Sequence, residues 1–448
     1  MSGRNTRDVP GRLTRRQFLK SSALAAAGTL GARPLFRSGS AAWGYPANDK
    51  LSIAVVGTAN QAGWNINQIQ SQNIVGLCDV DRNYLKAAAA RFPQAKTFRD
   101  VRNMLSEMHE SIDAVLVATP DHIHAPASMM AMRMGKHVYC EKPLAHSVFE
   151  ARAMAQLAAE KQLATQMGTQ IHAGSNYRRV VELIRAGAIG TVQRVHVWCG
   201  KSWSGGRYQF GHEVPENLDW DLWLGPSEQR PFCANVHPGQ WRRYWQWGTG
   251  TLGDMACHYV DLVHWALDLM YPTAVWVEGP EVHPEGTPEW LIVNYQHPAR
   301  GTNQPPVQVT WYDGGKRPDI LKNLKNKNGE PIQWGDGQLF VGSEGSILSN
   351  YGSHLLLPED KFADYKRPEP SIPDSIGHHN EWFEACRNGT PTTCNFTYSG
   401  ALSEAVLLGN VAFRLGQRIE WDAKALAVRN LAEAAKYIKP DFRAGWTR

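Results

Sequence analysis

Two segments far apart in the chain carry the side chains best suited to chemistry. The first supplies Lys142, and the second supplies Asp254 and His258, which are four residues apart. In a helix, residues at this spacing lie on one face. A lysine, an aspartate and a histidine that converge on one point can take a proton from a hydroxyl group while a bound cofactor accepts the hydride. The pattern therefore predicts the oxidation of a sugar or polyol hydroxyl.

The cofactor site is expected upstream of Lys142, in the first part of the chain after the N-terminal segment. Gly57-Thr58-Ala59 follows an apolar run at 51–56, where the glycine-rich turn of a dinucleotide fold would lie, although alanines replace its second and third glycines. Asp79 follows a second apolar run. A carboxylate there accepts hydrogen bonds from ribose hydroxyls and repels a 2′-phosphate, which favours NAD. Arg82 nearby leaves NADP open.

Short apolar runs and helical patterns alternate from residue 50 to residue 168. We expect strands at 51–56, 73–79, 113–118 and 137–140, with 165–168 closing the domain, and helices at 64–70, 84–92 and 147–161. This alternation is typical of a doubly wound parallel sheet, so the fold class is α/β and residues 48–170 form a Rossmann domain.

The pattern changes beyond residue 171. We expect strands at 192–199, 274–278, 290–295 and 307–312, helices at 177–186, 254–269 and 399–415, and surface loops at 301–306 and 313–331. Residues 171–448 therefore form a second α/β domain, with an open, mostly antiparallel sheet.

A turn follows the third expected strand at 119–124. Thr119, Pro120, His122 and His124 would lie at the carboxyl end of a parallel strand, where the nicotinamide half of the cofactor passes. A His-x-His pair can also bind a metal, but the sequence places no convincing third ligand, so we expect no metal.

The first 42 residues are typical of an export signal. Arg15-Arg16 followed by Phe18-Leu19 is a twin-arginine pattern, and the apolar run after it is too short for a stable membrane span. We expect export of the folded protein by the twin-arginine route to a periplasmic or extracytoplasmic location.

Charge and cysteine content argue against a nucleic-acid-binding protein, a disulfide-rich framework and a zinc site. Residues 1–42 hold eight Lys or Arg and one Asp, a charge of +7, so the remainder of the chain, whose total is +5, is near −2 (5 − 7). This gives no electrostatic reason to expect nucleic acid as a partner. Seven cysteines without a Cys-x-x-Cys pair make neither a disulfide framework nor a zinc site, although a bridge between Cys386 and Cys394 stays open.

Three motifs together carry a resemblance to a known family. The chain resembles the glucose–fructose oxidoreductase/inositol dehydrogenase/MocA family in Glu141-Lys142-Pro143, in the turn at 119–124 and in the spacing Asp254-x-x-x-His258-x-x-Asp261. The resemblance implies an NAD(P)-dependent oxidoreductase of sugars or polyols and homo-oligomers formed through the C-terminal sheet. Because free nicotinamide cofactor is scarce outside the cytoplasm, the expected export also predicts that the cofactor stays tightly bound. Some members of the family instead cleave glycosides through transient sugar oxidation. A non-catalytic sugar-binding protein is disfavoured because all three catalytic positions are filled.

The resemblance and the spacing together assign a set of site residues. His258 is expected as the general base, Lys142 polarises the substrate oxygen, and Asp254 orients the base or contacts a neighbouring hydroxyl. Expected cofactor contacts are Gly57, Thr58, Ala59, Asp79, Thr119, Pro120, His122, His124, Glu141, Lys142 and Gln170. Expected substrate contacts are His172, Asn176, Trp241 and Arg242.

Overall fold

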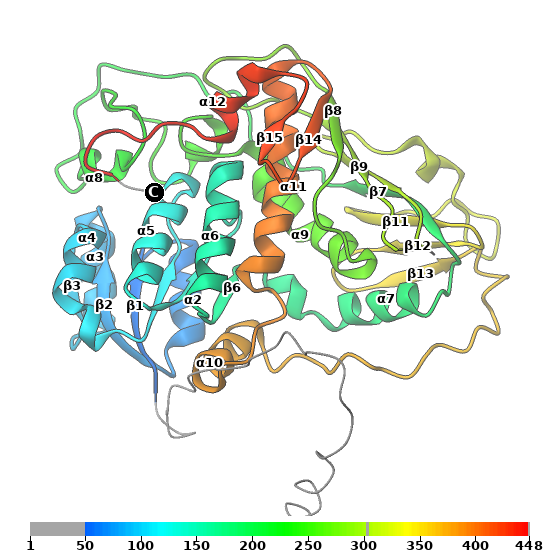
Figure 1. Ribbon diagram of the computed structural model, residues 1–448, viewed down its shortest axis with the longest axis horizontal. Coiled ribbons are helices and arrows are strands. Elements are labelled where there is room, and N and C mark those ends of the chain that lie inside the picture. The colour runs from blue at the N-terminus through cyan, green and yellow to red at the C-terminus, as the bar shows by residue number, and fades with distance from the viewer. Residues whose placement is uncertain (1–49, 302–303, 447–448) are drawn as a thin grey trace, which may run out of the picture. The chain divides into compact units, whose positions relative to one another are not determined.

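The computed structural model describes residues 50–301 and 304–446 (Figure 1), so the expected export signal lies outside the described residues. The first sheet has six parallel strands in the order β3-β2-β1-β4-β5-β6. Its strands are β1 (Ser52–Val56), β2 (Asn73–Cys78), β3 (Lys96–Phe98), β4 (Ala114–Val117), β5 (His137–Cys140) and β6 (Thr165–Met167). The Rossmann fold expected for this part of the chain is confirmed.

Helices connect these strands and cover the sheet. They are α2 (Gln61–Ile69), α3 (Arg82–Arg91), α4 (Val101–Met108), α5 (Asp121–Arg133) and α6 (Val148–Glu160). Side chains cap three of them: Asp81 accepts hydrogen bonds at the beginning of α3, Asp100 accepts one at the beginning of α4, and Ser147 and Glu150 form a capping box on α6. All residues of β4 are fully buried, as expected of a central strand covered on both faces.

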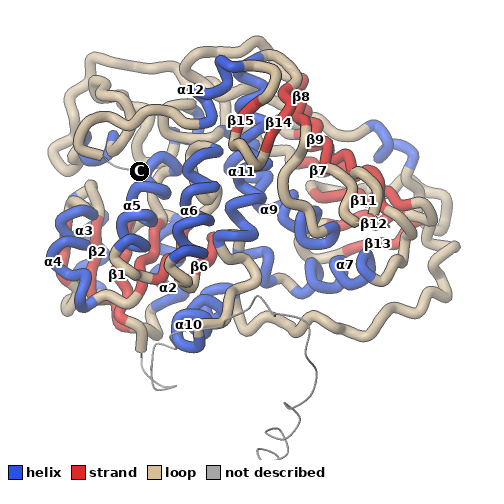
Figure 2. The backbone as a smooth tube through the Cα atoms, viewed as in Figure 1, coloured by secondary structure: helices blue, strands red, loops and turns tan. Residues whose placement is uncertain are grey.

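The second sheet has nine strands in the order β13-β12-β11-β7-β10-β9-β8-β14-β15, and it is antiparallel except for the parallel pair β7 and β10. Its strands are drawn in red in Figure 2. Its strands are β7 (Val192–Trp198), β8 (Ala274–Glu278), β9 (Ile292–His297), β10 (Val307–Tyr312), β11 (Gly337–Gly342), β12 (Ser346–Ser349), β13 (His354–Leu357), β14 (Ile419–Asp422) and β15 (Ala427–Val428). The mostly antiparallel second sheet is confirmed, whereas a homo-oligomer joined through it stays a prediction.

The helices of this part are α7 (Ser175–Arg185), α8 (Trp220–Leu224), α9 (Gly250–Leu267), α10 (His378–Asn388), α11 (Phe396–Leu415) and α12 (Ala435–Ile438). Two of them pack against the first domain. Helix α11 runs along α6 (Figure 1), and α10 adds Trp382 and Phe383 to the core beneath β1 and β4. The Trp382 ring lies 5.6 Å from that of Tyr139 in β5. The C-terminal part of the chain therefore completes the Rossmann core.

Some elements and one possible disulfide bridge differ between the sequence-based expectation and the structure. Helices α4, α5, α8, α10 and α12 and strands β3 and β11 to β15 were not expected from the sequence, and the expected loop at 313–331 contains the short 3-10 helix Asp319–Asn323. The bridge left open between Cys386 and Cys394 does not form, because both are buried free thiols. Within the described ranges, no helix combines the length and apolar character needed to cross a membrane.

Candidate active site

A cavity opens at the carboxyl ends of β1, β2 and β4. Its lining includes Gly57, Thr58, Ala59, Asp79, Thr119 and Pro120, six of the residues expected to bind the cofactor. The first turn of α2 borders the same cavity, and backbone N–H groups at a helix start attract phosphate. The residues present therefore fit a dinucleotide at the place where a Rossmann fold binds one.

The turn after β1 depends on Gly57. Its φ is +86°, and a Cβ added there would lie 2.5 Å from the carbonyl oxygen of Ala118, so only glycine fits. Asp79 then holds the loop, because its Oδ2 accepts hydrogen bonds from the backbone nitrogen and the hydroxyl of Thr58, at 2.8 and 2.9 Å. Burial is the main reason that the pKa of Asp79 is raised. The alanine at position 59 lies in the same turn without disturbing it.

The two histidines of the 119–124 turn support it rather than line the cavity. The ring nitrogens of His124 lie 2.8 and 2.9 Å from the carbonyl oxygens of Pro143 and Thr119, so this side chain ties two neighbouring turns together. His122 is buried against Trp223 and bonds to its carbonyl oxygen. Their positions differ from the expectation of direct cofactor contact because α5 begins at Asp121 and directs both rings into the protein.

Glu141 and Gln170 form a second buried polar group below the sheet's carboxyl edge. The Glu141 carboxylate accepts hydrogen bonds from Asn65 and Gln170, at 2.9 and 2.8 Å. A Cβ at Gly168 would lie about 2.5 Å from this carboxyl group, so a glycine there makes room for it. Neither Glu141 nor Gln170 belongs to the cavity lining, and both shape the segment that carries Lys142.

Two of the three expected catalytic residues, Lys142 and Asp254, meet across the two domains. Lys142 follows β5, and its Nζ lies 2.6 Å from Oδ1 of Asp254 and 2.8 Å from the Asp254 carbonyl oxygen in α9. Both side chains are mostly buried, with exposed fractions of 13% and 6%. Despite desolvation, the nearby Lys142, Arg242 and Lys201 hold the pKa of Asp254 well below its usual range. Asp254 is thus an ionised anchor for Lys142.

His258 lies one turn further along α9 and is half-buried. Within the described residues, its ring nitrogens make no hydrogen bond, and only its backbone carbonyl is engaged, by the Tyr177 hydroxyl at 3.0 Å. Desolvation and then the charge of Lys142 lower its pKa to about 3, so the imidazole is neutral near pH 7. No hydrogen bond joins it to Asp254, so the expected orienting role of Asp254 is directed to Lys142 instead.

Three further side chains bond to the Asp254 carboxylate. The sequence analysis did not single out Lys201 or Trp203, and it expected Arg242 as a substrate contact. Lys201 Nζ and Trp203 Nε1 lie 3.0 and 2.7 Å from Oδ2, and Arg242 Nε lies 3.1 Å from Oδ1. Arg242 and the buried Trp241 also line the cofactor cavity, so the Asp254 cluster adjoins it. Lys201 and Trp203 come from the loop after β7, and no spacing rule pointed to them.

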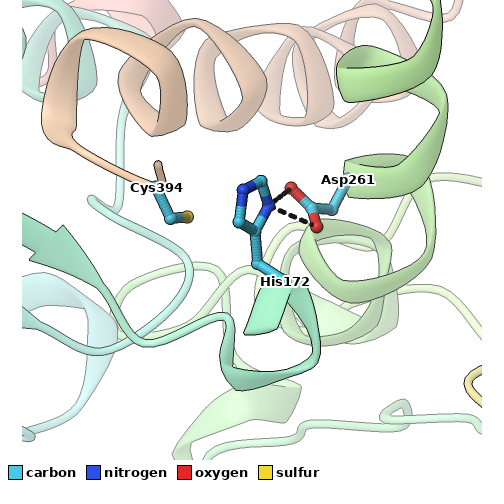
Figure 3. A group of neighbouring side chains, drawn as sticks. All are labelled: His172, Asp261 and Cys394. Atoms are coloured by element: carbon cyan, nitrogen blue, oxygen red, sulfur yellow. Dashed lines mark hydrogen bonds and ion pairs between the residues drawn. The ribbon is translucent and has the colours of Figure 1, made fainter. Parts of the chain in front are cut away.

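His172, an expected substrate contact, is fully buried (Figure 3). Its Nδ1 lies 2.9 and 3.0 Å from the two carboxylate oxygens of Asp261 in α9, and Cys394 lies beside the ring. The ring stacks on Trp265 at 4.0 Å. The expectation of a direct substrate contact is therefore not met, because tertiary packing encloses this side chain.

Asn176, another expected substrate contact, serves a loop instead. Its amide nitrogen donates to the carbonyl oxygens of Asn350 and Ser353, and its oxygen lies 2.7 Å from His354 Nδ1. Its polar atoms are thus engaged by the segment between β12 and β13. Of the four expected substrate contacts, Trp241 and Arg242 are the two that the structure brings to the cavity.

Comparisons with known proteins agree with this geometry. Residues 51–169 match the model for an oxidoreductase family with an NAD-binding Rossmann fold, and residues 176–303 match the model for that family's C-terminal alpha/beta domain. An inositol 2-dehydrogenase from Rubrobacter xylanophilus is 27% identical over 34% of this chain and 44% of its own length. A glycosyl hydrolase family 109 protein from Shewanella pealeana is 24% identical over 52% of this chain and 51% of its own length.

The chain thus spans about half of these relatives' length or less. Among solved structures, a levoglucosan dehydrogenase in complex with NADH and levoglucosan shares the fold, with a TM-score of 0.54 and 16% identity, over 83% of this chain and 99% of that one. The NAD-binding family model and the cavity at the carboxyl edge of the first sheet together identify the cofactor as NAD. The chain belongs to the glucose–fructose oxidoreductase/inositol dehydrogenase/MocA family of NAD-binding oxidoreductases.

Proposed function

We propose that this protein oxidises a CH–OH group of a sugar, polyol or glycoside and retains its NAD between turnovers. One observation carries the proposal: Arg242 lines the cofactor cavity and also bonds to Asp254, so the Lys142–Asp254 pair adjoins the place where NAD binds. When bound, NAD supplies the acceptor for the hydride that leaves the substrate carbon.

His258 is the general base in this proposal. Its ring nitrogens have no protein partner among the described residues, and the lowered pKa of about 3 keeps it unprotonated at neutral pH. A neutral ring nitrogen without a protein partner is free to accept the hydroxyl proton as the carbonyl forms, and a pKa closer to neutrality in the substrate complex would strengthen it as a base. An imidazole that bonded to a protein acceptor would have to break that bond first.

Lys142 positions and polarises the substrate oxygen. Asp254 fixes its ammonium group through the carboxylate and the backbone carbonyl, which uses two of its three N–H donors. The third donor is available to a substrate oxygen, where a positive charge stabilises the negative charge that develops on deprotonation. Asp254, already bonded to three cations, acts as the anchor of this arrangement.

Retention of the cofactor is supported by contacts made beside the cavity. Residues 217–219 pair with the chain after β2: Asp219 N donates to the Val80 carbonyl, and Arg82 N donates to that of Asn217. His237 Nε2 lies 3.0 Å from Asp81 Oδ2. At the C-terminus, Trp446 lines the cavity. Release of the nucleotide would require several of these contacts to open.

The experiment is to purify the protein, denature it and identify any released nucleotide by mass spectrometry. We expect NAD or NADH in near-stoichiometric amount. The native protein is then screened against sugars, polyols and aryl glycosides, with cofactor fluorescence and released aglycone as the two readouts. Recovery of mainly NADP(H), or no change in either readout over a broad panel, would argue against the proposal.

A second candidate reaction is redox-neutral cleavage of a glycoside. The contacts beside the cavity favour it, because a tightly held cofactor is most easily reused when the hydride returns to the same substrate. One relative is named as a glycosyl hydrolase of family 109. Aglycone release without net accumulation of NADH would select this reaction, whereas stoichiometric NADH would select simple oxidation.

We also propose export by the twin-arginine route, which suits a protein that must fold around its nucleotide first. The support is the sequence Arg15-Arg16-Gln17-Phe18-Leu19. Replacing both arginines by lysine should leave the precursor in the cytoplasm, as measured by cell fractionation. Unchanged appearance outside the cytoplasmic membrane would contradict the proposal.

A further inference from the structure

The cluster around Asp254 contains more positive than negative charge. Lys142, Lys201 and Arg242 all lie within 3.1 Å of the one carboxylate, so three cations share a single anion. Structural ion pairs in proteins normally approach balance, because desolvated charge without a partner is costly. The surplus here amounts to two positive charges.

The nearby carboxyl groups do not cancel this surplus. Asp121 is buried and its pKa is raised to about 7, chiefly by desolvation, so it is only partly ionised at neutral pH. Its Oδ2 accepts a hydrogen bond from the Thr249 hydroxyl at 2.7 Å. Asp336, the residue before β11, accepts the backbone N–H of Gly200 and adds one negative charge, which is less than the surplus of two. The site therefore stays cationic when its neighbours are included.

The surplus charge is accessible from outside. The Lys201 side chain is 42% exposed and that of Arg242 is 25% exposed, compared with 6% for Asp254. Arg242 uses Nε for Asp254, and its two Nη groups donate to no acceptor among the described residues. Such an open guanidinium edge matches a carboxylate, sulfate or phosphate ester through two parallel hydrogen bonds.

The indole of Trp203 lies beside these cations. The ammonium of Lys201 is 4.8 Å from the Trp203 ring centroid, and the guanidinium of Arg242 is 5.6 Å from it. Trp203 also bonds to Asp254, which fixes its orientation. A fixed indole beside cations offers a surface for the apolar face of a sugar ring and, next to it, a site for an acidic substituent.

We infer that the substrate is an anionic sugar, with Lys201 and Arg242 binding its carboxylate, sulfate or phosphate group. This inference rests on the proposed function, whose reacting hydroxyl lies at Lys142 and His258. A substrate anion also compensates the charges of Lys142 and Lys201 that disfavour protonation of His258, so it improves His258 as a proton acceptor in the complex. The acidic group thus contributes to binding and to proton transfer.

The test compares sugars that differ only in charge. Aryl glucuronides are paired with the matching aryl glucosides, and glucose 6-sulfate and glucose 6-phosphate are paired with glucose, to separate the three sources of negative charge. Binding is measured by calorimetry on the nucleotide-loaded protein, and turnover by NADH and aglycone. We expect at least one acidic member to bind about 10-fold or more tightly than its neutral partner, with an advantage that shrinks at high salt.

Two variants examine the residues themselves. Because both residues also bond to Asp254, the decisive quantity is the Kd or KM for the acidic sugar divided by that for its neutral partner, and Lys201→Met and Arg242→Met should each raise this ratio by roughly 10- to 100-fold. Lys322→Met is the control, because this lysine is exposed on another element, where it pairs with Asp319. An equal fall in kcat for both classes of sugar would show that Lys201 merely positions Asp254, which would overturn the inference.

The outcomes separate this inference from the proposed function. If neutral sugars alone bind and react, or if no acidic sugar of the panel binds, the inference is wrong while the oxidoreductase proposal is judged by turnover and nucleotide content. If acidic sugars bind in a Lys201-dependent manner but nothing is oxidised or cleaved, the anion site stands and the proposed function fails. Loss of bound NAD in the Lys201→Met variant would also overturn the inference, because it would place the charge with the cofactor.

Discussion

Replacement of His258 by alanine should remove turnover while leaving the fold nearly intact. The ring is half-buried, makes no side-chain hydrogen bond within the described residues, and faces the Tyr351 ring at 6.4 Å. Because no buried polar partner is left unpaired, the stability cost is limited to lost packing, about 1 kcal/mol. For a chain of this size that corresponds to a melting-temperature shift of about 2 °C.

The expected loss of activity is much larger. Removal of a positioned proton acceptor lowers turnover by roughly 10²-fold or more, or about 2.7 kcal/mol in the activation free energy. Bound NAD should be retained, because His258 belongs to α9 and does not line the cofactor cavity. The assay measures turnover per folded molecule, melting temperature and nucleotide content on one preparation.

His264, on the same helix, is the control. It is 1% exposed and its ring lies 5.4 Å from that of His297, so His264→Ala opens a cavity and should cost about 2 kcal/mol or more in stability. Its turnover per folded molecule should stay near that of the wild type. Near-normal turnover in His258→Ala, together with a large fall in melting temperature, would refute the assignment of His258 as the base.

Gly57→Ala should abolish NAD retention, measured by mass spectrometry, because its Cβ would lie 2.5 Å from the Ala118 carbonyl oxygen at a φ of +86°; full nucleotide content would contradict this. Asp79→Ala should reduce the preference for NAD over NADP by about 1–3 kcal/mol, and an unchanged ratio of Kd values would count against the ribose-binding role. Urea unfolding should show lower stability at pH 5 than at pH 7.5. The pKa values of His122 and His379 are lowered to about 3 in the folded protein, compared with about 6.5 in the unfolded chain. Between these two pH values the unfolded chain binds more protons than the folded protein. The free energy of unfolding present above pH 6.5 is therefore lost as the pH falls. A flat profile between these pH values would refute the last expectation.

The sequence alone was sufficient for the elements whose signals are local. Alternating strands and helices predicted the parallel sheet, and the expected helix at 254–269 matches α9 (Gly250–Leu267) closely. Spacing also placed Asp254 and His258 on one helix, because a separation of four residues is a property of helix geometry itself. Lys142 was found for a similar reason, since residues at the carboxyl ends of parallel strands gather at one edge of a sheet.

Short elements without a strong pattern were missed. Strand β13 (His354–Leu357) has four residues, too few for an alternating pattern to stand out from a loop. Helix α5 (Asp121–Arg133) begins directly after Pro120 and contains Pro126. Its residues are buried on all sides of the helix, so the sequence lacks the apolar stripe that marks a surface helix. These elements are stabilised mainly by their neighbours in the fold.

Only the tertiary structure decided which side chains meet. Spacing along the chain carries no information on partners that come from separate elements, so Lys201 and Trp203 could not be assigned to Asp254 before the loop after β7 was placed beside α9. For the same reason His172 looked like a substrate contact, whereas packing buries it completely against Asp261. The residue types and their local spacing thus determined the chemistry available to this protein, and long-range packing determined which of those groups stay exposed to a substrate.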